Sequence, residues 1–176
     1  MENVKKNIIV LFPGRGYTVN NPLLYYAKHK YEAKGYECIS INYGDSFDEG
    51  KTFDDVKNIV LTQTKDVDFS LFGDVLFFSK SVGTVLAGWL AETLDIKVRH
   101  IYLTPLQGTL RYIKGRDIQI VVAGTKDKYL DSVILSEHCE KEKINLELIE
   151  NANHSLEING DVSENIDILK RIVDAN

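Results

Sequence analysis

The sequence predicts a three-layer α/β/α sandwich built on a mostly parallel sheet of about six strands. Short apolar runs alternate with amphipathic segments along the chain. Strands joined by crossover helices must run parallel, with helices on both faces of the sheet. The length of 176 residues and the hydrophobic content of 44% are typical of one well-packed domain. We therefore expect residues 1–176 to form a single domain.

Each predicted strand is a short, mainly apolar run. The run at Asn7–Phe12 is continuous, as in a fully buried strand, and Asp74–Ser79 is the clearest strand of all. The last run, Ile144–Ile149, alternates apolar and polar residues, which suits a strand at the edge of the sheet. The other predicted strands are Tyr36–Tyr43, Val98–Leu103 and Asp117–Ala123.

The predicted helices are marked by apolar spacing near 3.6 residues and by signals at their ends. Asn21 and Pro22 provide a cap and a first-turn proline for the first helix, and Gly35 is its stop signal. Asp131 is the expected cap of a later helix. The predicted helices are Pro22–Lys34, Phe53–Asp66, Val82–Leu94, Leu106–Lys114, Asp131–Glu142 and Ser163–Val173. A polar loop is expected at Asp45–Gly50.

Charge and hydropathy exclude several kinds of partner. The net charge of −5 argues against nucleic-acid binding, which needs a basic face. Apolar stretches such as Val82–Leu90 contain Gly and Thr and are shorter than the roughly 20 residues that cross a bilayer. The segment Met1–Asn7 has no apolar signal-peptide region. We therefore expect a cytoplasmic protein that binds neither nucleic acid nor membranes; the oligomeric state stays open.

The clearest chemical motif is Ser79-Lys80-Ser81-Val82-Gly83, between the third predicted strand and its helix. Active sites of parallel sheets lie at the carboxyl ends of the strands. A serine with small residues two positions before and after it, here Ser79 and Gly83, is typical of a strained turn that exposes the serine hydroxyl. Free amides at the helix N-terminus also favour negative charge near Ser81. The alternative for Ser81 is a simple helix cap.

A nucleophilic serine needs a base, and the base needs an orienting carboxylate. Among the four histidines, only His154 lies in a loop after a predicted strand. We expect His29 and His138 on exposed helix faces and His100 as a packed or edge residue of a strand. The alternative for His154 is plain exposure to solvent.

The candidate carboxylate is Asp127, in Gly124-Thr125-Lys126-Asp127 after the fifth predicted strand. Asp131 is a nearby rival, but it is expected to cap a helix. Taken alone, Asp127 is equally a turn residue. Together, Ser81, Asp127 and His154 place three complementary groups at one edge of a parallel sheet.

These motifs resemble the α/β-hydrolase fold superfamily, and the resemblance covers nearly the whole chain from Asn7 onward. It implies that Ser81 is the nucleophile, His154 the base and Asp127 its orienting partner. It also implies an oxyanion hole made by the backbone amides of Arg15 and Val82, and it requires no cofactor or metal. The loop Phe12-Pro13-Gly14-Arg15-Gly16-Tyr17 is similar to the family's HGxG loop, with Pro13 in place of histidine. Possible substrate contacts are Gly14, Tyr17 and Lys80.

The chain departs from the family pattern in three places. Ser79 replaces the usual glycine of the turn, the first strand begins at Asn7 without the family's first hairpin, and the loop Thr104-Pro105-Leu106-Gln107 leaves no room for a lid. The chain is therefore similar to the small carboxylesterase and dienelactone-hydrolase-like members. An open, shallow site favours short acyl groups.

These features predict a serine hydrolase that cleaves small ester or thioester substrates through an acyl-enzyme. Arg15 and Lys80 flank the expected site; they either point to solvent or favour an anionic substrate. One alternative is a hydrolase-like protein that binds a ligand or partner without turnover. Another is a Rossmann-like nucleotide-binding domain at Gly14-Arg15-Gly16, although Val19 stands where the third glycine of GxGxxG belongs.

Overall fold

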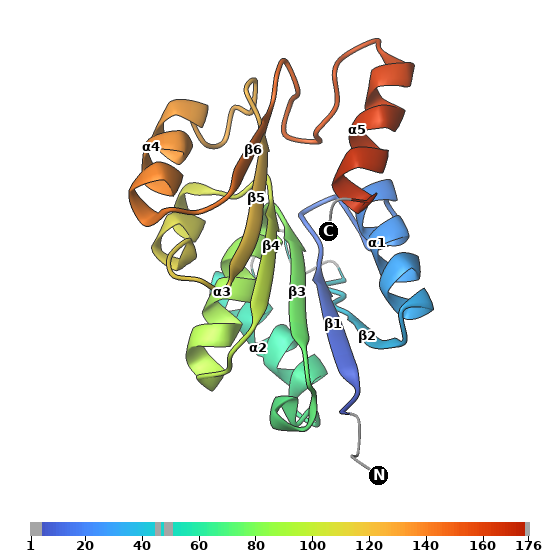
Figure 1. The fold of residues 1–176 in the computed structure, drawn as a ribbon. Coiled ribbons are helices and arrows are strands. Elements are labelled where there is room, and N and C mark those ends of the chain that lie inside the picture. Colours follow the sequence, from blue (N-terminus) through green and yellow to red (C-terminus); the bar gives the residue numbers. More distant parts are fainter. Residues whose placement is uncertain (1–4, 45–46, 48–50, 175–176) are drawn as a thin grey trace.

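The computed structural model describes residues 5–44, 47 and 51–174. Its described strands form one parallel sheet with β6 at an edge, as the sequence predicts, and the strand order is β2-β1-β3-β4-β5-β6 (Figure 1). The strands are β1 (Asn7–Phe12), β2 (Tyr36–Ser40), β3 (Val75–Lys80), β4 (Arg99–Leu103), β5 (Ile118–Gly124) and β6 (Leu146–Ile149). The chain order reverses beside β1, which lies between β2 and β3. Sites in such sheets form at the carboxyl ends near this point.

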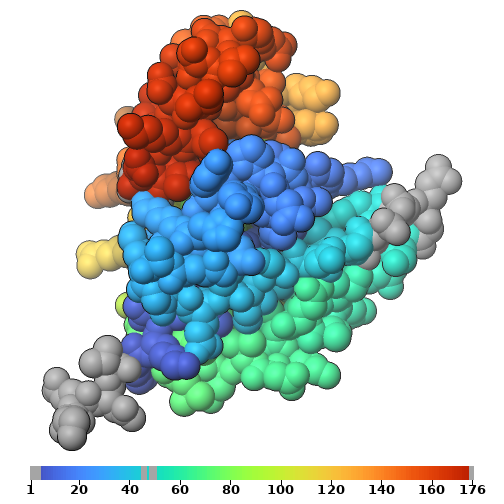
Figure 2. Space-filling model, turned by 90° about the vertical axis from the view of Figure 1, so that its right-hand side faces the viewer, coloured from blue at the N-terminus to red at the C-terminus, as the bar shows by residue number. Residues whose placement is uncertain are grey.

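Helices cover both faces of the sheet, as expected for crossover connections (Figure 1). The α-helices are α1 (Pro22–Ala33), α2 (Phe53–Thr64), α3 (Val82–Leu94), α4 (Ser132–Glu142) and α5 (Val162–Asp174). Two short 3₁₀ helices, η1 (Phe69–Leu71) and η2 (Gln107–Tyr112), complete the set. Helices α1 and α5 pack side by side on one face, which is turned to the viewer in Figure 2, whereas α2, α3 and α4 cover the other.

Alternation along β3 divides the core into two layers. Val75 and Phe77 pack in the layer under α2, α3 and α4, whereas Leu76 and Phe78 pack in the layer under α1 and α5. Because successive strand side chains point to opposite faces, the last residue of β3, Lys80, belongs to the layer of Leu76 and Phe78. All side chains of β3 are buried.

The observed element ends differ from the predicted ones in a few places. Strand β2 stops at Ser40 rather than Tyr43, although the amide of Ile41 still donates to the carbonyl of Leu11 at 3.0 Å. The helix predicted at Leu106–Lys114 is the 3₁₀ helix η2. The predicted loop Asp45–Gly50 lies outside the described residues except for Phe47, as do the first four residues of the N-terminal segment.

Both predicted helix caps occupy the N-cap position, but only Asp131 makes a capping hydrogen bond with its side chain. The side chain of Asn21 accepts from the amide of Thr18 at 2.7 Å and makes no capping bond to α1, because it closes the preceding turn instead. The carboxylate of Asp131 accepts from the amide of Val133 at 2.7 Å and so caps α4. Within the described part of the chain, none of the helices has the length and apolar character to cross a bilayer.

Candidate active site

Ser81 lies in a strained turn between β3 and α3. Its backbone has a φ of 55° and a ψ of −124°, in a region that residues other than glycine rarely adopt. A Cβ at position 83 would lie 2.3 Å from the carbonyl oxygen of Phe12, so only glycine fits there. Ser79 is fully buried, and its hydroxyl donates to the carbonyl of Ile101 at 3.1 Å. Small residues on both sides therefore let the turn raise Ser81 above the sheet.

The structure brings Ser81, His154 and Asp127 together in one hydrogen-bonded chain. Nε2 of His154 lies 2.8 Å from the hydroxyl oxygen of Ser81, and Nδ1 lies 2.6 Å from Oδ2 of Asp127. A neutral imidazole with its proton on Nδ1 donates to Asp127 and accepts from Ser81. The Asp127 side chain is 1% exposed and that of His154 20%, so the imidazole has an open side whereas the carboxylate is enclosed.

The loop after β5 holds Asp127 with its own backbone. The amide of Asp127 donates to the carbonyl of Gly124 at 3.1 Å, and the amide of Tyr129 donates to Oδ1 of Asp127 at 2.9 Å. Each carboxylate oxygen therefore has one donor, Tyr129 on one side and His154 on the other. These two hydrogen bonds fix the orientation of the buried carboxylate.

The loop after β6 crosses directly over the end of β5. A Cβ at position 124 would lie 2.1 Å from the carbonyl oxygen of Ala152, so the crossing needs glycine. The amide of Lys126 donates to the same carbonyl at 2.9 Å. The side chain of Asn153 accepts from the amide of Ser155 at 2.7 Å and closes the turn around His154. This crossing brings His154 within reach of Asp127.

The loop after β1 packs against the turn at Ser81. A Cβ at position 14 would lie 3.0 Å from Cβ of Ser81. Gly14 and Tyr17 exchange backbone hydrogen bonds of 3.0 and 3.3 Å, which turn the chain sharply at Arg15. In the described structure the amides of Arg15 and Val82 donate no hydrogen bond to the protein. Val82 directly follows Ser81, and Arg15 directly follows Gly14, which packs against Ser81. Both unpaired amides therefore lie close to Ser81 along the chain or across this packing contact.

Lys80 does not have the exposed position that the sequence suggested. It is 1% exposed, and its ammonium donates to Oγ1 of Thr104 at 2.9 Å and to the carbonyl oxygen of His154 at 2.7 Å. The prediction that Lys80 points to solvent is therefore wrong, and substrate contact by Lys80 stays a prediction. The loop after β6 and the ring of Tyr17, 4.8 Å from the ammonium, cover the end of β3.

Tyr17 is half-buried at the same edge. Its hydroxyl accepts from the amide of Leu23 at 3.1 Å, and burial raises the pKa of its phenol to about 12. Gly14 is buried and Arg15 is exposed. Substrate contacts by Gly14 and Tyr17 stay predictions.

The remaining histidines lie away from this chain of hydrogen bonds. His29 is exposed beside Glu32, and His100 is buried against the ring of Tyr102, which lowers the pKa of its imidazole to about 4. His138, expected in solvent, is half-buried because Nε2 bonds the carbonyl of Ile113 at 2.8 Å. No cluster of three metal-ligating side chains occurs among the described residues.

A cavity of about 370 Å³ opens beside His154. Its lining residues are Lys126, Lys128, Tyr129, Asn153, His154 and Ser155. The Tyr129 ring lies 4.4 Å from the imidazole of His154. Sequence reasoning missed Lys126, Lys128 and Tyr129 as residues of this cavity; their positions within two residues of Asp127 were the available signal. Only three residues separate β4 from η2, so no lid is inserted there.

Solved structures share this architecture, whereas no family model and no curated protein matches the chain. An alpha-beta serine hydrolase homologue from Coxiella burnetii is 14% identical, over 99% of this chain and 87% of that chain, with a TM-score of 0.65. XC6422 from Xanthomonas campestris, an α/β serine hydrolase without a lid, is 15% identical over 96% and 80%, with a TM-score of 0.62. Est1E from Butyrivibrio proteoclasticus, with ferulic acid bound, is 12% identical over 99% and 89%, with a TM-score of 0.66. The chain thus has the lidless form of the α/β-hydrolase fold.

Proposed function

We propose that the protein is a serine hydrolase that cleaves small esters or thioesters. The observation that supports this most is the unbroken chain from Ser81 through His154 to Asp127, with links of 2.8 and 2.6 Å. A nucleophile hydrogen-bonded to a base, which is in turn hydrogen-bonded to a carboxylate, is the arrangement that activates a serine. The position of Ser81 on a strained turn adds support, since backbone strain is kept where function requires it.

In the first half-reaction Ser81 becomes acylated. Its hydroxyl oxygen attacks the carbonyl carbon while its proton passes to Nε2 of His154. The bond between that carbon and the leaving oxygen or sulfur then breaks, and His154 returns the proton to the leaving group. The products are an acylated Ser81 and a free alcohol or thiol. Asp127 stabilises the imidazolium that forms between the two proton transfers.

In the second half-reaction water replaces the leaving group. His154 takes a proton from the water as its oxygen attacks the acyl carbon, and the bond to Ser81 breaks as that proton returns to the Ser81 oxygen. A carboxylic acid leaves, and the free enzyme is restored. We assign the oxyanion hole of both steps to the amides of Arg15 and Val82, which are not engaged by other described groups. Preorganised donors of this kind lower the barrier strongly.

The substrate is proposed to be small because the site is open. The cavity beside His154 measures about 370 Å³, near the lower end of ordinary ligand pockets. No lid from the β4–η2 connection covers it.

Both cysteines carry free thiols, which supports the proposal of a reducing, cytoplasmic location.

Labelling with a fluorophosphonate tests this function, because the reagent needs an activated serine. The wild-type protein should be labelled stoichiometrically, and peptide mapping should find the label on Ser81. Ser79→Ala is the matched control; it should be labelled normally, since the Ser79 hydroxyl only donates to a carbonyl inside the core. No label, or a label on another residue, would favour the alternative of a hydrolase-like protein that binds without turnover.

A further inference from the structure

Lys80 is an ionisable side chain on a buried face of β3. It directly precedes Ser81 and shares its face with Leu76 and Phe78, both in the core layer under α1 and α5. It is 1% exposed. A lysine is almost never fully buried without partners, because removing its charge from water costs several kcal/mol. An apolar residue would pack here without that cost, so stability does not account for a lysine at this position.

The two hydrogen bonds of the Lys80 ammonium join two strand ends. One goes to Oγ1 of Thr104, the residue after β4, at 2.9 Å. The other, at 2.7 Å, goes to the carbonyl oxygen of His154 in the loop after β6. Thr104 itself is held by its amide, which donates to the carbonyl of Val122 at 2.7 Å. The ammonium therefore ties the backbone of His154 to the rigid end of the sheet.

The groups around the ammonium come from three loops. The ring of Tyr17, from the loop after β1, lies 4.8 Å away. The carboxylates of Asp127, after β5, and Glu157, in the loop after β6, favour the charged form, but burial outweighs them and lowers the pKa of Lys80 to about 8. The ammonium is thus protonated at neutral pH, and it interacts electrostatically with Asp127, the hydrogen-bond partner of His154.

We propose that Lys80 is a positioning residue for the base. This inference rests on the proposed function of His154. Lys80 fixes the carbonyl of His154 and thereby holds the imidazole between Ser81 and Asp127. It acts through His154 and does not touch the reacting atoms, because its ammonium is enclosed and both acceptors lie within the protein. A base must be held at hydrogen-bond distance from its proton donor, and small misplacements from that position are costly.

A double-mutant cycle tests the inference. Lys80→Met keeps an unbranched side chain on the apolar face and removes the donor. We expect kcat for p-nitrophenyl acetate to fall about 10–100-fold with little change in KM. In a His154→Ala background the same substitution should add no further loss, since the base that it positions is gone. An equal fold-loss in both backgrounds would overturn the inference. Lys97→Met, an exposed lysine at the opposite end of β4, is the matched control and should keep full activity.

A second measurement does not depend on turnover. The short hydrogen bond from His154 Nδ1 to Asp127 should give a downfield proton resonance, assigned by its absence in Asp127→Asn. In Lys80→Met that resonance should broaden or disappear while the thermal midpoint is kept or raised. Thr104→Val, nearly the same in shape, should show a weaker form of the same effect, which keeps the test available if Lys80→Met does not fold. An unchanged resonance in both variants would contradict the inference. If the resonance is lost in the variants but the wild-type protein is not labelled by fluorophosphonate, the proposed function alone is contradicted.

Discussion

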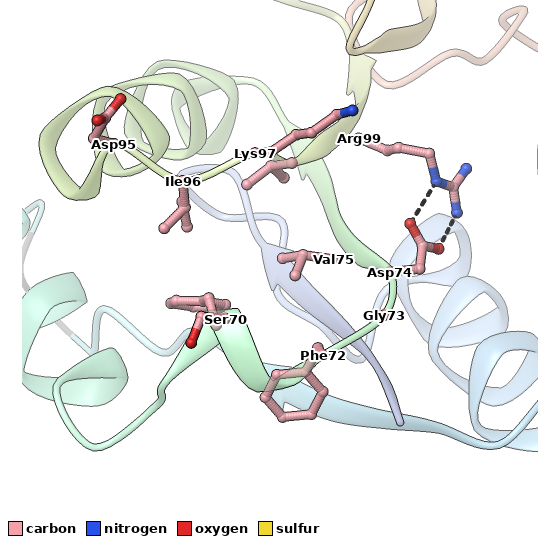
Figure 3. Close-up of a pocket in the computed structure, with 11 residues that line it drawn as sticks. Ser70, Phe72, Gly73, Asp74, Val75, Asp95, Ile96, Lys97 and Arg99 are labelled. Atoms are coloured by element: carbon pink, nitrogen blue, oxygen red, sulfur yellow. Dashed lines mark hydrogen bonds and ion pairs between the residues drawn. The ribbon is translucent and has the colours of Figure 1, made fainter. Parts of the chain in front are cut away.

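The two ends of the sheet carry polar networks of similar composition and different design. At the carboxyl end, Asp127 holds His154, which contacts Ser81. At the amino end, Asp74 accepts two hydrogen bonds from Arg99, with distances of 2.8 and 2.5 Å, beside a cavity of about 540 Å³ (Figure 3). The hydroxyl of Tyr36 donates to Asp74 at 2.6 Å as well. At both ends a carboxylate thus accepts hydrogen bonds from a nitrogen-containing side chain. Of the two cavities, the one at the amino end is larger.

Backbone strain separates the two networks better than cavity volume does. Besides Ser81, non-glycine residues with positive φ include Thr104, Asn151 and Leu156, and all four lie in loops at the carboxyl edge. The other two described cases, Asp95 and Lys143, are C-caps of helices, where such a φ is ordinary. The network at the amino end contains neither strain of this kind nor a nucleophile next to its base. We therefore expect the network at the amino end to stabilise the fold, whereas the residues with positive φ gather around the proposed site at the carboxyl end.

Among the differences within the carboxyl edge, the largest expected loss of kcat/KM distinguishes Asp127 from the nearby Asp131. Asp127→Asn should lower kcat/KM by about 10³–10⁴-fold, because an amide cannot stabilise the imidazolium or hold its tautomer. Asp131→Asn, the matched control, should leave kcat/KM within a few-fold, since asparagine also caps helices. Steady-state kinetics with p-nitrophenyl acetate measures both. A greater loss in Asp131→Asn would show that Asp127 is the wrong acid.

The buried charge of Lys80 should appear as a pH-dependent stability. Below pH 8 both native and unfolded chains carry this proton, and the native state bears the full cost of the buried charge. Between pH 8 and the ordinary lysine pKa of 10.5, only the unfolded chain holds the proton, so stability rises with pH. The lowered pKa corresponds to about 3 kcal/mol.

Lys80→Met lacks this cost at every pH and provides the reference. Its free energy of unfolding in urea should exceed that of wild type most at pH 7, and the difference should shrink by about 3 kcal/mol on going to pH 10.5. Other titrating groups cancel in the difference. A difference that is the same at both pH values would contradict a pKa near 8 for Lys80.

The open cavity predicts how rate depends on the substrate. Each methylene that becomes buried contributes about 0.8 kcal/mol, so a deep tunnel would raise kcat/KM steadily from acetate to palmitate esters. We expect the rise to stop after the shortest chains. Esters that carry a carboxylate should be favoured over neutral ones, because the exposed Lys126 and Lys128 line the cavity; Lys128→Glu should remove the preference. A steady climb to palmitate would point to a tunnel built by Tyr17, Phe47 or Pro105–Tyr112.

The smallest effect is expected at the amino end. Arg99→Ala should lower the free energy of unfolding by about 1 kcal/mol, because the pair is partly exposed, and leave kcat/KM unchanged. The Arg99 guanidinium holds the pKa of Asp74 below its usual range. The stabilisation is therefore complete above the ordinary Asp pKa of about 4 and fades as the pH falls toward the lowered value. Urea unfolding at pH 7 and pH 3 checks this; a loss of activity would mean that the two ends are coupled.

The sequence was sufficient for the strands and for the three residues of the hydrogen-bonded chain. Apolar runs such as Asn7–Phe12 signal strands locally, and parallel connections bring their carboxyl ends to one edge. The turn at Ser81 was recognisable because close packing against Phe12 demands a glycine at position 83. These features depend on neighbouring residues or on topology, which the pattern of apolar residues determines.

The burial of Lys80 depends on segments far away in the sequence, and sequence reasoning missed it. Its charge suggests exposure, whereas the loop at His154 and the ring of Tyr17 lie over it. Strand alternation was the available signal, because Lys80 shares a face with Leu76 and Phe78. The Tyr129 contact with His154 was missed for a similar reason, since it depends on how two loops meet.

The most direct test of the central claim compares two serines of one turn. Ser81→Ala and Ser79→Ala each remove one hydroxyl, and they differ in whether that hydroxyl contacts His154 or a core carbonyl. Hydrolysis of p-nitrophenyl acetate should fall by about 10⁴-fold or more in Ser81→Ala and stay within a few-fold of wild type in Ser79→Ala, with both variants folded by circular dichroism. Undiminished turnover in Ser81→Ala would contradict the proposal that this strained turn carries the nucleophile.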